Sequence, residues 1–452
     1  MKITRPLSPR LLHHFARKWS LAVVGLACAV TSSKPASAEV TLFKNDSGWE
    51  FATDGRANGF LNYQWGDDLP ADRTPPHPVV AGAGFGPSQL DQNGKFAFAR
   101  IRSGFIGNIL GFTIKKTLNA NTSVRAHTSI WSIIESAKDK AGQNIPDVRE
   151  TYLKVDGPWG GVLVGRALGL FSRGAVTLDA LYEHGNGLGV NCPQGLEGRG
   201  PTCGHVGFGV LFPGFNSQIT YNTPTFAGLQ LTAGLFDPVN LTGNYDRTPI
   251  PRPEGELTYD NDFGSGKVHV FVNGMWQPLY ETANNTKDRL LNDPTANPKP
   301  KKVYAKGAGF GAWGEISVLR LGFAGHVGDG LGYIYALENQ NAQVDPHRDL
   351  RSYSGFYGTL GVKLSKLYLA GGVGATMAKA SAADNAAIAQ SIAMGVMPQE
   401  FVNRQMGESA GAYYSLADSL ILAVDYFHAN ISFYLGDKQK VDTLNGGLSF
   451  IW

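Results

Sequence analysis

The clearest pattern in the chain is an alternation of apolar and polar positions at its C-terminal end. One parity holds Leu444, Leu448, Phe450 and Trp452, and the other holds Thr443, Asn445, Gly447 and Ser449. Because side chains alternate between the two faces of a strand, this segment predicts a strand with one apolar, aromatic face and one small, polar face. A soluble sandwich would bury the apolar face. A transmembrane barrel would turn it to lipid and the polar face to a watery lumen.

Similar segments of about ten residues recur along the chain, separated by Gly, Asn, Asp and Pro. We count sixteen of them, at 48–65, 96–117, 122–134, 147–155, 161–171, 216–224, 229–236, 255–263, 267–280, 304–317, 319–333, 351–364, 367–379, 404–416, 420–434 and 440–452. An even number places both ends on one side, and sixteen strands enclose an aqueous channel rather than a packed interior. Fourteen or eighteen strands stay open as alternatives.

The connections between these segments are alternately short and long. Short ones include 118–121, 156–160 and 264–266, and the long polar stretches are 66–95, 135–146, 172–215, 237–254, 281–303, 334–350 and 380–403. This predicts an all-β transmembrane antiparallel barrel with short periplasmic turns and long external loops. The Ala-rich stretch 382–394 predicts a short external helix.

The first 38 residues have the three parts of a secretory signal peptide. They carry six Lys or Arg and no acid, an apolar run over Leu21–Val30, and Ala36-Ser37-Ala38 before the expected cleavage point. Cleavage there turns the formal charge from +3 to −3, so the basic character that would have favoured nucleic-acid binding disappears. We expect a signal peptide over 1–38 and one barrel domain over 39–452.

Composition supports a single barrel over a set of soluble domains. The chain has 452 residues, of which 17% are charged and 57 are glycine, whereas soluble proteins carry roughly 25% charged residues. A mean hydropathy of −0.14 fits the average of a lipid-facing outside and a watery inside. No Cys/His spacing resembles a zinc site and no catalytic motif is found, so no cofactor, metal or catalytic residue is expected.

Two cysteines, Cys192 and Cys203, remain after the expected cleavage. An even pair in an exported protein predicts a disulfide, which here closes a short loop, and two free thiols are the alternative.

Two segments in the middle of the chain give the sequence a family resemblance. The hairpin from Tyr152 to Gly165-Arg166, followed by a long stretch at 172–215, resembles the strand pair and third loop of the Gram-negative general porins. Asn216–Gly228 resembles that family's Asn-Ser-x-x-x-Tyr-x-Ser-Pro-x-Phe-x-Gly segment, with Thr223 in place of Ser. Trp452 stands where the family's terminal aromatic residue is commonly Phe.

The architectural resemblance covers about 40–452, and the motifs are concentrated in 147–230 and at the C-terminus. It implies a homotrimer in the outer membrane of a Gram-negative bacterium, in contact with lipid and lipopolysaccharide. It also implies a third loop folded into the lumen, and passive diffusion of ions and small hydrophilic solutes without enzyme activity.

The same alternation predicts which charges face the water. An arginine on the lipid face at mid-membrane costs about 2–4 kcal/mol, so we expect a basic wall in the lumen made of Arg56, Arg100, Arg102, Arg125 and Arg166. A place at the headgroup rim is the alternative for each. In the resembled family, acids of the third loop face a basic cluster. On that pattern Asp179 and Glu183 oppose the arginines, with solvated loop acids as the alternative. Opposed charges would orient water and dipolar solutes.

Other functions stay open at this point. A substrate-selective channel for phosphate, other anions or sugars would need an arginine ladder or an aromatic slide along the lumen. A barrel enzyme would need a smaller barrel and a Ser/His or Asp/His set, and a soluble exported β-protein is disfavoured by the parity of the last strand.

Overall fold

The structure is a computed structural model that describes residues 39–67, 96–134, 147–179, 181, 202–241, 245–246, 248–292, 297–337, 343–396 and 401–452. All of these residues belong to one unit of the chain, Ala36–Trp452. The expected signal peptide over 1–38 lies outside the described residues and stays a prediction.

The described residues form nineteen strands in one sheet. They are β1 (Val40–Lys44), β2 (Trp49–Gly66), β3 (Phe96–Arg102), β4 (Asn108–Asn119), β5 (Thr122–Ser132), β6 (Asp147–Gly157), β7 (Gly160–Leu168), β8 (Phe215–Asn222), β9 (Leu229–Phe236), β10 (Tyr245–Asp246), β11 (Arg252–Asp262), β12 (Gly266–Glu281), β13 (Lys302–Ile316), β14 (Leu319–Asp329), β15 (Ser352–Leu364), β16 (Leu367–Ala378), β17 (Val402–Ala417), β18 (Leu420–Phe433) and β19 (Lys438–Ile451). Each predicted segment overlaps one of these strands, except 96–117, which overlaps both β3 and β4, so the predicted barrel is confirmed.

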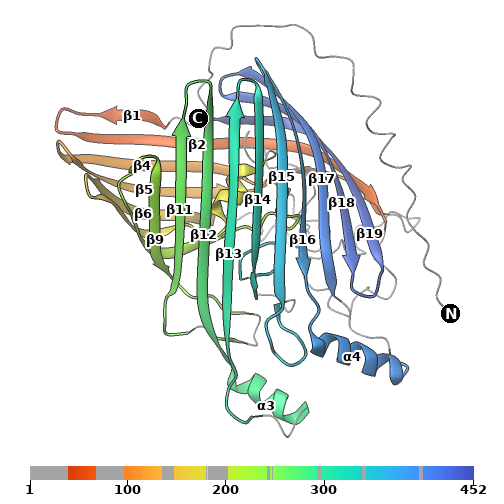
Figure 1. Cartoon of the computed structure of the whole chain (residues 1–452). Helices are drawn as coiled ribbons and strands as arrows, with labels where there is room; N and C mark the ends of the chain where they lie inside the picture. The colour runs from red at the N-terminus through yellow and green to blue at the C-terminus, as the bar shows by residue number, and fades with distance from the viewer. Residues whose placement is uncertain are drawn as a thin grey trace. The chain divides into compact units, whose positions relative to one another are not determined.

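The sheet closes into an antiparallel barrel, because β9 pairs with β11 and the last strand β19 pairs with β2 (Figure 1). The short strands β1 and β10 are additions to β2 and β12. Since β3 and β4 pair with successive parts of β2, they count as one wall strand, and sixteen strands surround the lumen.

The two faces of the wall differ as the sequence pattern predicts. On the outer face, register aligns Tyr414, Leu422 and Leu448 in one row across β17–β19, with 40–46% of each side chain exposed. On the inner face, the Asn62 amide donates to Asn445 Oδ1 over 2.5 Å. Apolar residues outside and amides inside are the arrangement of a membrane barrel around a polar interior.

The second wall strand is interrupted, although one continuous strand over 96–117 was expected. Residues 103–107 leave the wall between β3 and β4, and Asn58 holds them in place. Its side-chain nitrogen donates to the carbonyls of Ile106 and Gly107 over 3.0 and 3.1 Å, and its Oδ1 accepts from the Gly104 amide over 2.9 Å. Ile106 and its neighbours are buried inside the barrel.

The long loops and the short turns lie at opposite ends of the barrel. Helices α3 (Ala283–Asn292) and α4 (Ala382–Ala393) both stand at the loop end (Figure 1). α4 confirms the helix expected at 382–394, whereas α3 was not predicted. Asp384 fastens α4, because Arg351 donates to both of its carboxylate oxygens over 2.6 and 3.0 Å. Among the described residues, no helix is long and apolar enough to cross a membrane.

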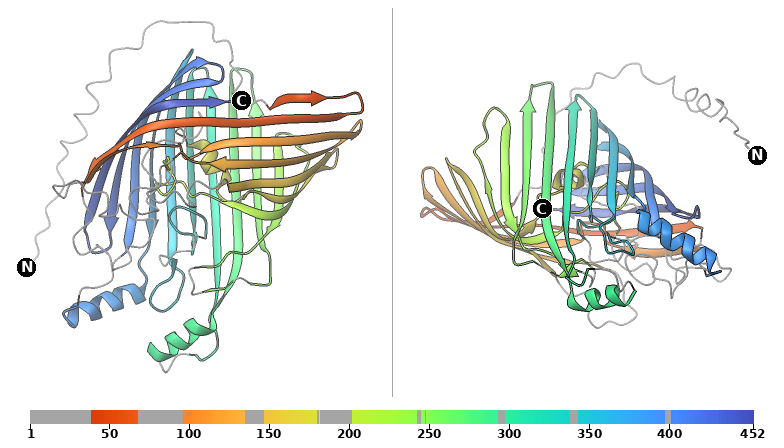
Figure 2. Two further views of the ribbon diagram at one scale, coloured as in Figure 1. Left: turned by 180° about the vertical axis from the view of Figure 1, so that it is seen from behind. Right: turned by 60° about the horizontal axis from the view of Figure 1, so that its bottom comes forward.

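The connection between β7 and β8, residues 169–214, is the third loop, and its described parts run inside the barrel. Its helix α1 (Arg173–Leu178) lies within the ring of strands (Figure 2). After it leaves β7, the loop first contacts β11, where the amides of Leu170 and Phe171 donate to Glu254 over 2.8 and 3.0 Å. It later reaches β17, where the Gln405 amide donates to the Gly207 carbonyl over 2.9 Å.

The third loop, which was expected to fold into the lumen, fills part of it with an apolar core. Phe171, Val176, Leu178, Phe208 and Leu211 are each at most 1% exposed. Inward glycines of the wall make room for them. A Cβ at Gly307 would lie 2.4 Å from the Phe171 ring, closer than real side chains approach.

Candidate functional site: the inner wall of the barrel

Three of the predicted arginines project inward from β2 and β3. Residues directly opposite in an antiparallel pair share a face. Arg100 lies opposite Asn62, and Arg102 lies opposite Phe60. Asn62 and Phe60 are on the buried, inward parity of β2, which Arg56 shares. The three side chains differ in exposure, because Arg100 is exposed whereas Arg102 is only 3% exposed.

Arg125 also projects inward, and acids surround it. Register places Arg125 of β5 opposite Lys115 of β4, which lies opposite Glu50 of β2. Glu39 lies 3.6 Å from Arg125 and also pairs with Lys115, whose Nζ is 3.4 Å from Glu50. The expected basic wall is therefore a wall of mixed charge, in which carboxylates pair with the basic side chains because opposite charges attract.

The position of Glu39 follows from the way in which the chain ends meet. Trp452 exchanges backbone hydrogen bonds with Gly55 over 2.8 and 3.1 Å, and β1 then pairs with β2 just beyond, with Val40 opposite Thr53. This extension of the wall carries Glu39, the residue that follows the expected cleavage point. We expected no strand before residue 48, so Glu39 was not among the predicted residues.

A second polar cluster follows on β2, β4, β5 and β6. Its members face inward at neighbouring register positions and comprise Asp54, Thr113, His127, Ser129, Glu150 and Tyr152. His127 Nδ1 lies 2.9 Å from Thr113 Oγ1, and the Ser129 hydroxyl donates to Glu150 over 3.3 Å. Asp54 and Glu150 were not among the predicted residues. Asp54 shares the parity of Arg56, so applying the alternation rule to carboxylates would have found it.

The basic residues occupy three levels along the wall. Along β2, Glu50 marks the level of Arg125, Arg56 is six residues further, and Asn62, opposite Arg100, is six more. At a rise of 3.3 Å per residue, each step is about 20 Å along the strand. The structure therefore distributes the arginines along the pore and does not gather them into one ring.

Arg166 differs from the expectation, because register places it on the outer face. It lies opposite Thr151 of β6 and Ser217 of β8. Its parity on β7 is that of Val164, which is 45% exposed and lies opposite the 57% exposed Ile219. The residues of β7 that face the lumen are instead Gly161, Leu163 and Gly165.

Asp179 also differs from the expectation of an acid that faces the pore water. Its carboxylate is 3% exposed. It accepts hydrogen bonds from the amides of Leu181 and His205 over 3.0 and 2.8 Å, and from the Tyr357 hydroxyl over 3.2 Å. These contacts join both parts of the third loop to β15, so Asp179 fastens the loop and does not line the open path.

His205 continues this fastening towards β17 and β18. Its Nε2 lies 2.7 Å from the Ser409 hydroxyl, and its ring centroid lies 4.9 Å from that of Phe427. Gly209 then crosses the backbone of β15 so closely that a Cβ would lie 2.1 Å from the Phe356 carbonyl oxygen. The third loop is thus attached to the wall opposite the charged one.

Two predicted residues, Glu183 and Cys192, lie outside the described residues. Cys203 is 1% exposed and is disulfide-bonded. Its pairing with Cys192 stays a prediction. Within the described ranges, no group of three His, Cys, Asp or Glu side chains is placed to hold a metal ion.

Comparisons with known proteins define the class of protein that has this wall and loop. The family model described as Gram-negative porin matches residues 25–426. The chain therefore belongs to the Gram-negative porins. It is an outer-membrane channel protein for the passive diffusion of solutes, and not an enzyme. Among curated protein sequences, none matches the chain.

Solved structures share the fold at low sequence identity. The outer-membrane channel DcaP of Acinetobacter baumannii superposes with a TM-score of 0.62 at 14% identity, over 91% of this chain and 99% of that one. The anion-selective porin of Comamonas acidovorans gives 0.55 at 11% identity, over 89% and 100%. OmpF of Salmonella typhi gives 0.51 at 12% identity, over 92% and 100%.

Proposed function

We propose that ions and small hydrophilic solutes cross the barrel along the inward face of β2–β6, in the space between this face and the third loop. The observation that carries the proposal is the distribution of charge. Solvent reaches charged inward side chains on this face, among them Arg100, which is exposed, and Arg125 and Lys115, which are partly exposed. The third loop is fastened to β15 and β17. A solute that keeps its hydration needs the polar side of such an interior.

Arg100 should then contribute to ion selectivity more strongly than Arg102. Arg100 is exposed and Arg102 is buried, so replacing Arg100 by Gln should shift the permeability ratio towards cations by about two- to fourfold. One unit charge several ångströms from a passing ion contributes somewhat under 1 kcal/mol in water. Reversal potentials of the reconstituted protein in a salt gradient measure this. An Arg100→Gln channel with the selectivity of the unaltered protein would contradict the proposal, and Arg102→Gln is the matched control.

A second candidate is a channel selective for anions, and the arginines at three levels of the wall favour it. It differs from a general channel in one measurable respect, since anions should then carry most of the current and a multivalent anion such as phosphate should slow the passage of chloride. Glu39 and Glu50 lie beside Arg125 and Lys115. These carboxylates reduce the net positive charge at the level of Arg125, so we favour the general channel.

We further propose that the protein is a homotrimer, as the family resemblance implies, and that the outer face of β5–β8 lies at the contact between protomers. Register aligns a polar row on this face, made of Thr128, Thr151, Arg166 and Ser217. Lipid contact at mid-membrane would cost about 2–4 kcal/mol for the arginine. At a contact between protomers, carbonyls and hydroxyls of the second protomer can accept hydrogen bonds from the arginine, which then does not face lipid.

Arg166→Glu should therefore lower the temperature at which trimers dissociate in a semi-native gel. Arg404→Glu is the matched control, because Arg404 faces outward from β17, opposite Met377. Equal stability of the Arg166→Glu protein and the unaltered one would exclude this face from the contact.

We also propose that the mature chain begins at Glu39 and that Cys192 is the disulfide partner of Cys203. The intact mass of protein extracted from outer membranes tests the first proposal. A non-reduced peptide map, in which the two cysteine peptides elute together, tests the second.

A further inference from the structure

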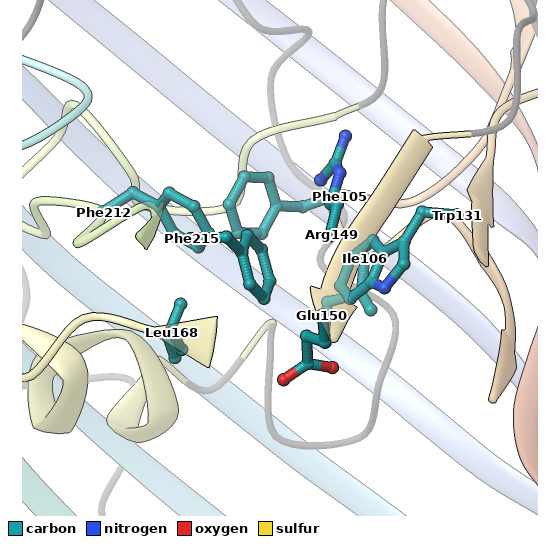
Figure 3. A pocket seen from close by; sticks show the side chains of 8 residues that line it. All are labelled: Phe105, Ile106, Trp131, Arg149, Glu150, Leu168, Phe212 and Phe215. Carbon is teal, nitrogen blue, oxygen red and sulfur yellow. The ribbon is translucent and has the colours of Figure 1, made fainter. Parts of the chain in front are cut away.

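We propose that a pocket between the third loop and the β5–β6 wall binds small aromatic solutes that carry both an ammonium and a carboxylate group, of which aromatic amino acids are the simplest. This rests on the channel function proposed above and adds a class of solute to it. The pocket lies inside the barrel, beside the inward bulge 103–107, and Figure 3 shows its side chains.

Four aromatic rings from three parts of the chain form the apolar side of the pocket. Phe105 belongs to the inward bulge, Trp131 to β5, and Phe212 and Phe215 stand where the third loop meets β8. The ring centroids are 5.1 Å apart for Phe105 and Phe212, and 5.3 Å apart for Trp131 and Phe215, in both cases edge to face. Such a set presents ring edges and faces to a further ring.

The size of the cavity suits one ring. Its volume is about 110 Å³. An apolar cavity of about 150 Å³ in another protein binds benzene, so the space here is on the order of a single aromatic group. The pocket takes the apolar part of a small solute and leaves the polar part at its rim.

A β-bulge turns two charged neighbours towards this pocket. Ser129 of β5 lies opposite Glu150, but Ile130 lies opposite Val148, so Arg149 is an extra residue in β6. In a regular strand, Arg149 and Glu150 would point to opposite faces of the wall. The bulge lets both line the pocket. Bulges that re-aim side chains in this way are frequent next to functional sites.

The two charges stand on opposite sides of the ring group in Figure 3. The Arg149 guanidinium lies over the Trp131 ring at 4.8 Å from its centroid, and its Nε donates to Asp147 over 3.0 Å. Stacking on an aromatic face leaves the edge of a guanidinium available to a carboxylate. Glu150 lies 4.0 Å from His127 Nε2, and its carboxylate offers acceptors to an ammonium group.

This pairing selects solutes by charge. A solute with a single charge would be attracted by one of the two side chains and repelled by the other. A solute with both charges is attracted by each, and its ring occupies the cavity. The lumen holds a comparable trio on the opposite wall, where Arg320 stacks on Trp313 at 4.4 Å and pairs with Glu315 over 2.9 Å. That trio does not line the pocket, so it supplies a matched control.

Current recordings on the full-length protein in planar bilayers test the inference. L-Phenylalanine should produce brief blockades of the ion current. L-alanine, which has the same charges without a ring, and benzoate, which has a ring and one charge, should produce few. Arg149→Gln should weaken the blockade by L-phenylalanine about tenfold, the size expected for one hydrogen bond to a charged group. Arg320→Gln should leave it unchanged.

Two outcomes separate the inference from the channel function. Channels that conduct normally but are blocked equally by L-phenylalanine and L-alanine would overturn the pocket and leave the channel standing, as would an Arg149→Gln channel blocked like the unaltered one. A protein that conducts no current would overturn the proposed path, and the pocket with it. If Arg149→Gln does not assemble, Phe105→Leu replaces it and should weaken blockade through the lost ring.

Discussion

The inward faces of β2–β6 and of β12–β18 are two walls of one barrel that differ in character. Charge is not confined to the first, since β13 and β14 carry the inward pair Glu315 and Arg320. We call the first the charged wall, since Arg56, Arg125 and Glu50 point from it. We call the second the packed wall, since the third loop lies against its glycines and rings, such as Gly307 and Phe427. Both outward faces carry exposed apolar side chains, such as Leu61 and Leu422. The difference shows that the outward residues define the barrel, while the inward residues decide where its open path runs.

The chemistry of each wall explains why the loop lies where it does. Ionic side chains cannot be covered by an apolar segment without a large loss of hydration energy, so the charged wall stays wet. The packed wall offers small residues for ring contacts and uncharged acceptors such as Thr376, whose hydroxyl accepts from the Gly209 amide over 2.9 Å. The proposed path therefore lies to one side of the lumen.

The largest change in conductance is expected from a substitution that detaches the third loop from the packed wall. Gly209→Ala places a Cβ 2.1 Å from the Phe356 carbonyl oxygen at a φ of +105°. Overpacking of this kind costs about 1–3 kcal/mol, so single-channel conductance should rise as the loop moves away. Gly395→Ala is the control, because φ is also positive there, at +67°, and nothing lies within 4 Å. Equal conductance of both variants would contradict this attachment.

A smaller effect on the current, but a larger loss of stability, is expected when the carboxylate that fastens the loop is removed. Asp179→Ala leaves the amides of Leu181 and His205 and the Tyr357 hydroxyl without this acceptor, at roughly 1–3 kcal/mol for each donor left unsatisfied. Thermal unfolding should shift downwards and current noise should increase, with little change in ion selectivity. A change in selectivity at unaltered stability would instead mean that Asp179 faces the passing ions.

On the charged wall, a substitution should change ion selectivity without changing stability. Glu50→Gln removes one acid beside Lys115, so the permeability ratio should move towards anions by less than about twofold, because exposed ion pairs contribute about 0–1 kcal/mol. Stability should not change. Glu408→Gln is the control, since Glu408 lies on the outward face opposite Val373, and its loss should leave selectivity unaltered.

The smallest effect on the current is expected at the loop end, away from both walls. Burial alone would raise the pKa of the Asp384 carboxyl, but the hydrogen bonds from Arg351 and from the Ser381 amide outweigh burial and hold the pKa below its ordinary value. Asp384 therefore stabilises the attachment of α4 at pH values above the ordinary pKa of a carboxyl. This contribution is lost as the pH falls through the lowered value.

Limited proteolysis of the α4 region against pH measures this effect. Cleavage should increase as the solution is acidified, and Asp384→Asn should be cleaved readily at every pH without a change in conductance. Insensitivity of the unaltered protein to acid would contradict the role of the pair. Asp418→Asn, at a short turn of the opposite end, is the control.

The barrel could be predicted from the sequence because lipid-facing and lumen-facing residues alternate along each strand. Arg166 shows that each residue of a strand must be assigned to a face by its parity, whatever its charge. Two valines, Val162 and Val164, share its parity, and they place it outside. The interruption of the second strand also left a signal, since Gly104 and Gly107 flank Phe105 and Ile106, although the anchoring of this bulge by Asn58 depends on the neighbouring strand.

The contacts of the third loop could not be predicted in the same way. The acceptor role of Asp179 depends on Tyr357, which is 178 residues away in the chain, and local patterns contain no information on such a pairing. The pocket depends on a bulge in β6, on an inward bulge before β4 and on the end of the loop. Each is a local departure from regular alternation, so the rule that predicts the strands does not predict the site.

The pairing of the first wall strand with the last has a consequence for how the protein is made. The hydrogen bond between Asn62 and Asn445 joins residues 383 positions apart. Contacts this remote in sequence form slowly, because the entropy of closing a long loop must be lost before they form. Until β19 arrives, β2 and every partial sheet expose unpaired strand edges, which favour aggregation. The chain must therefore be kept unfolded and separate until β19 has emerged, and a deletion within β19 should be more harmful to assembly than a deletion of similar size in any external loop.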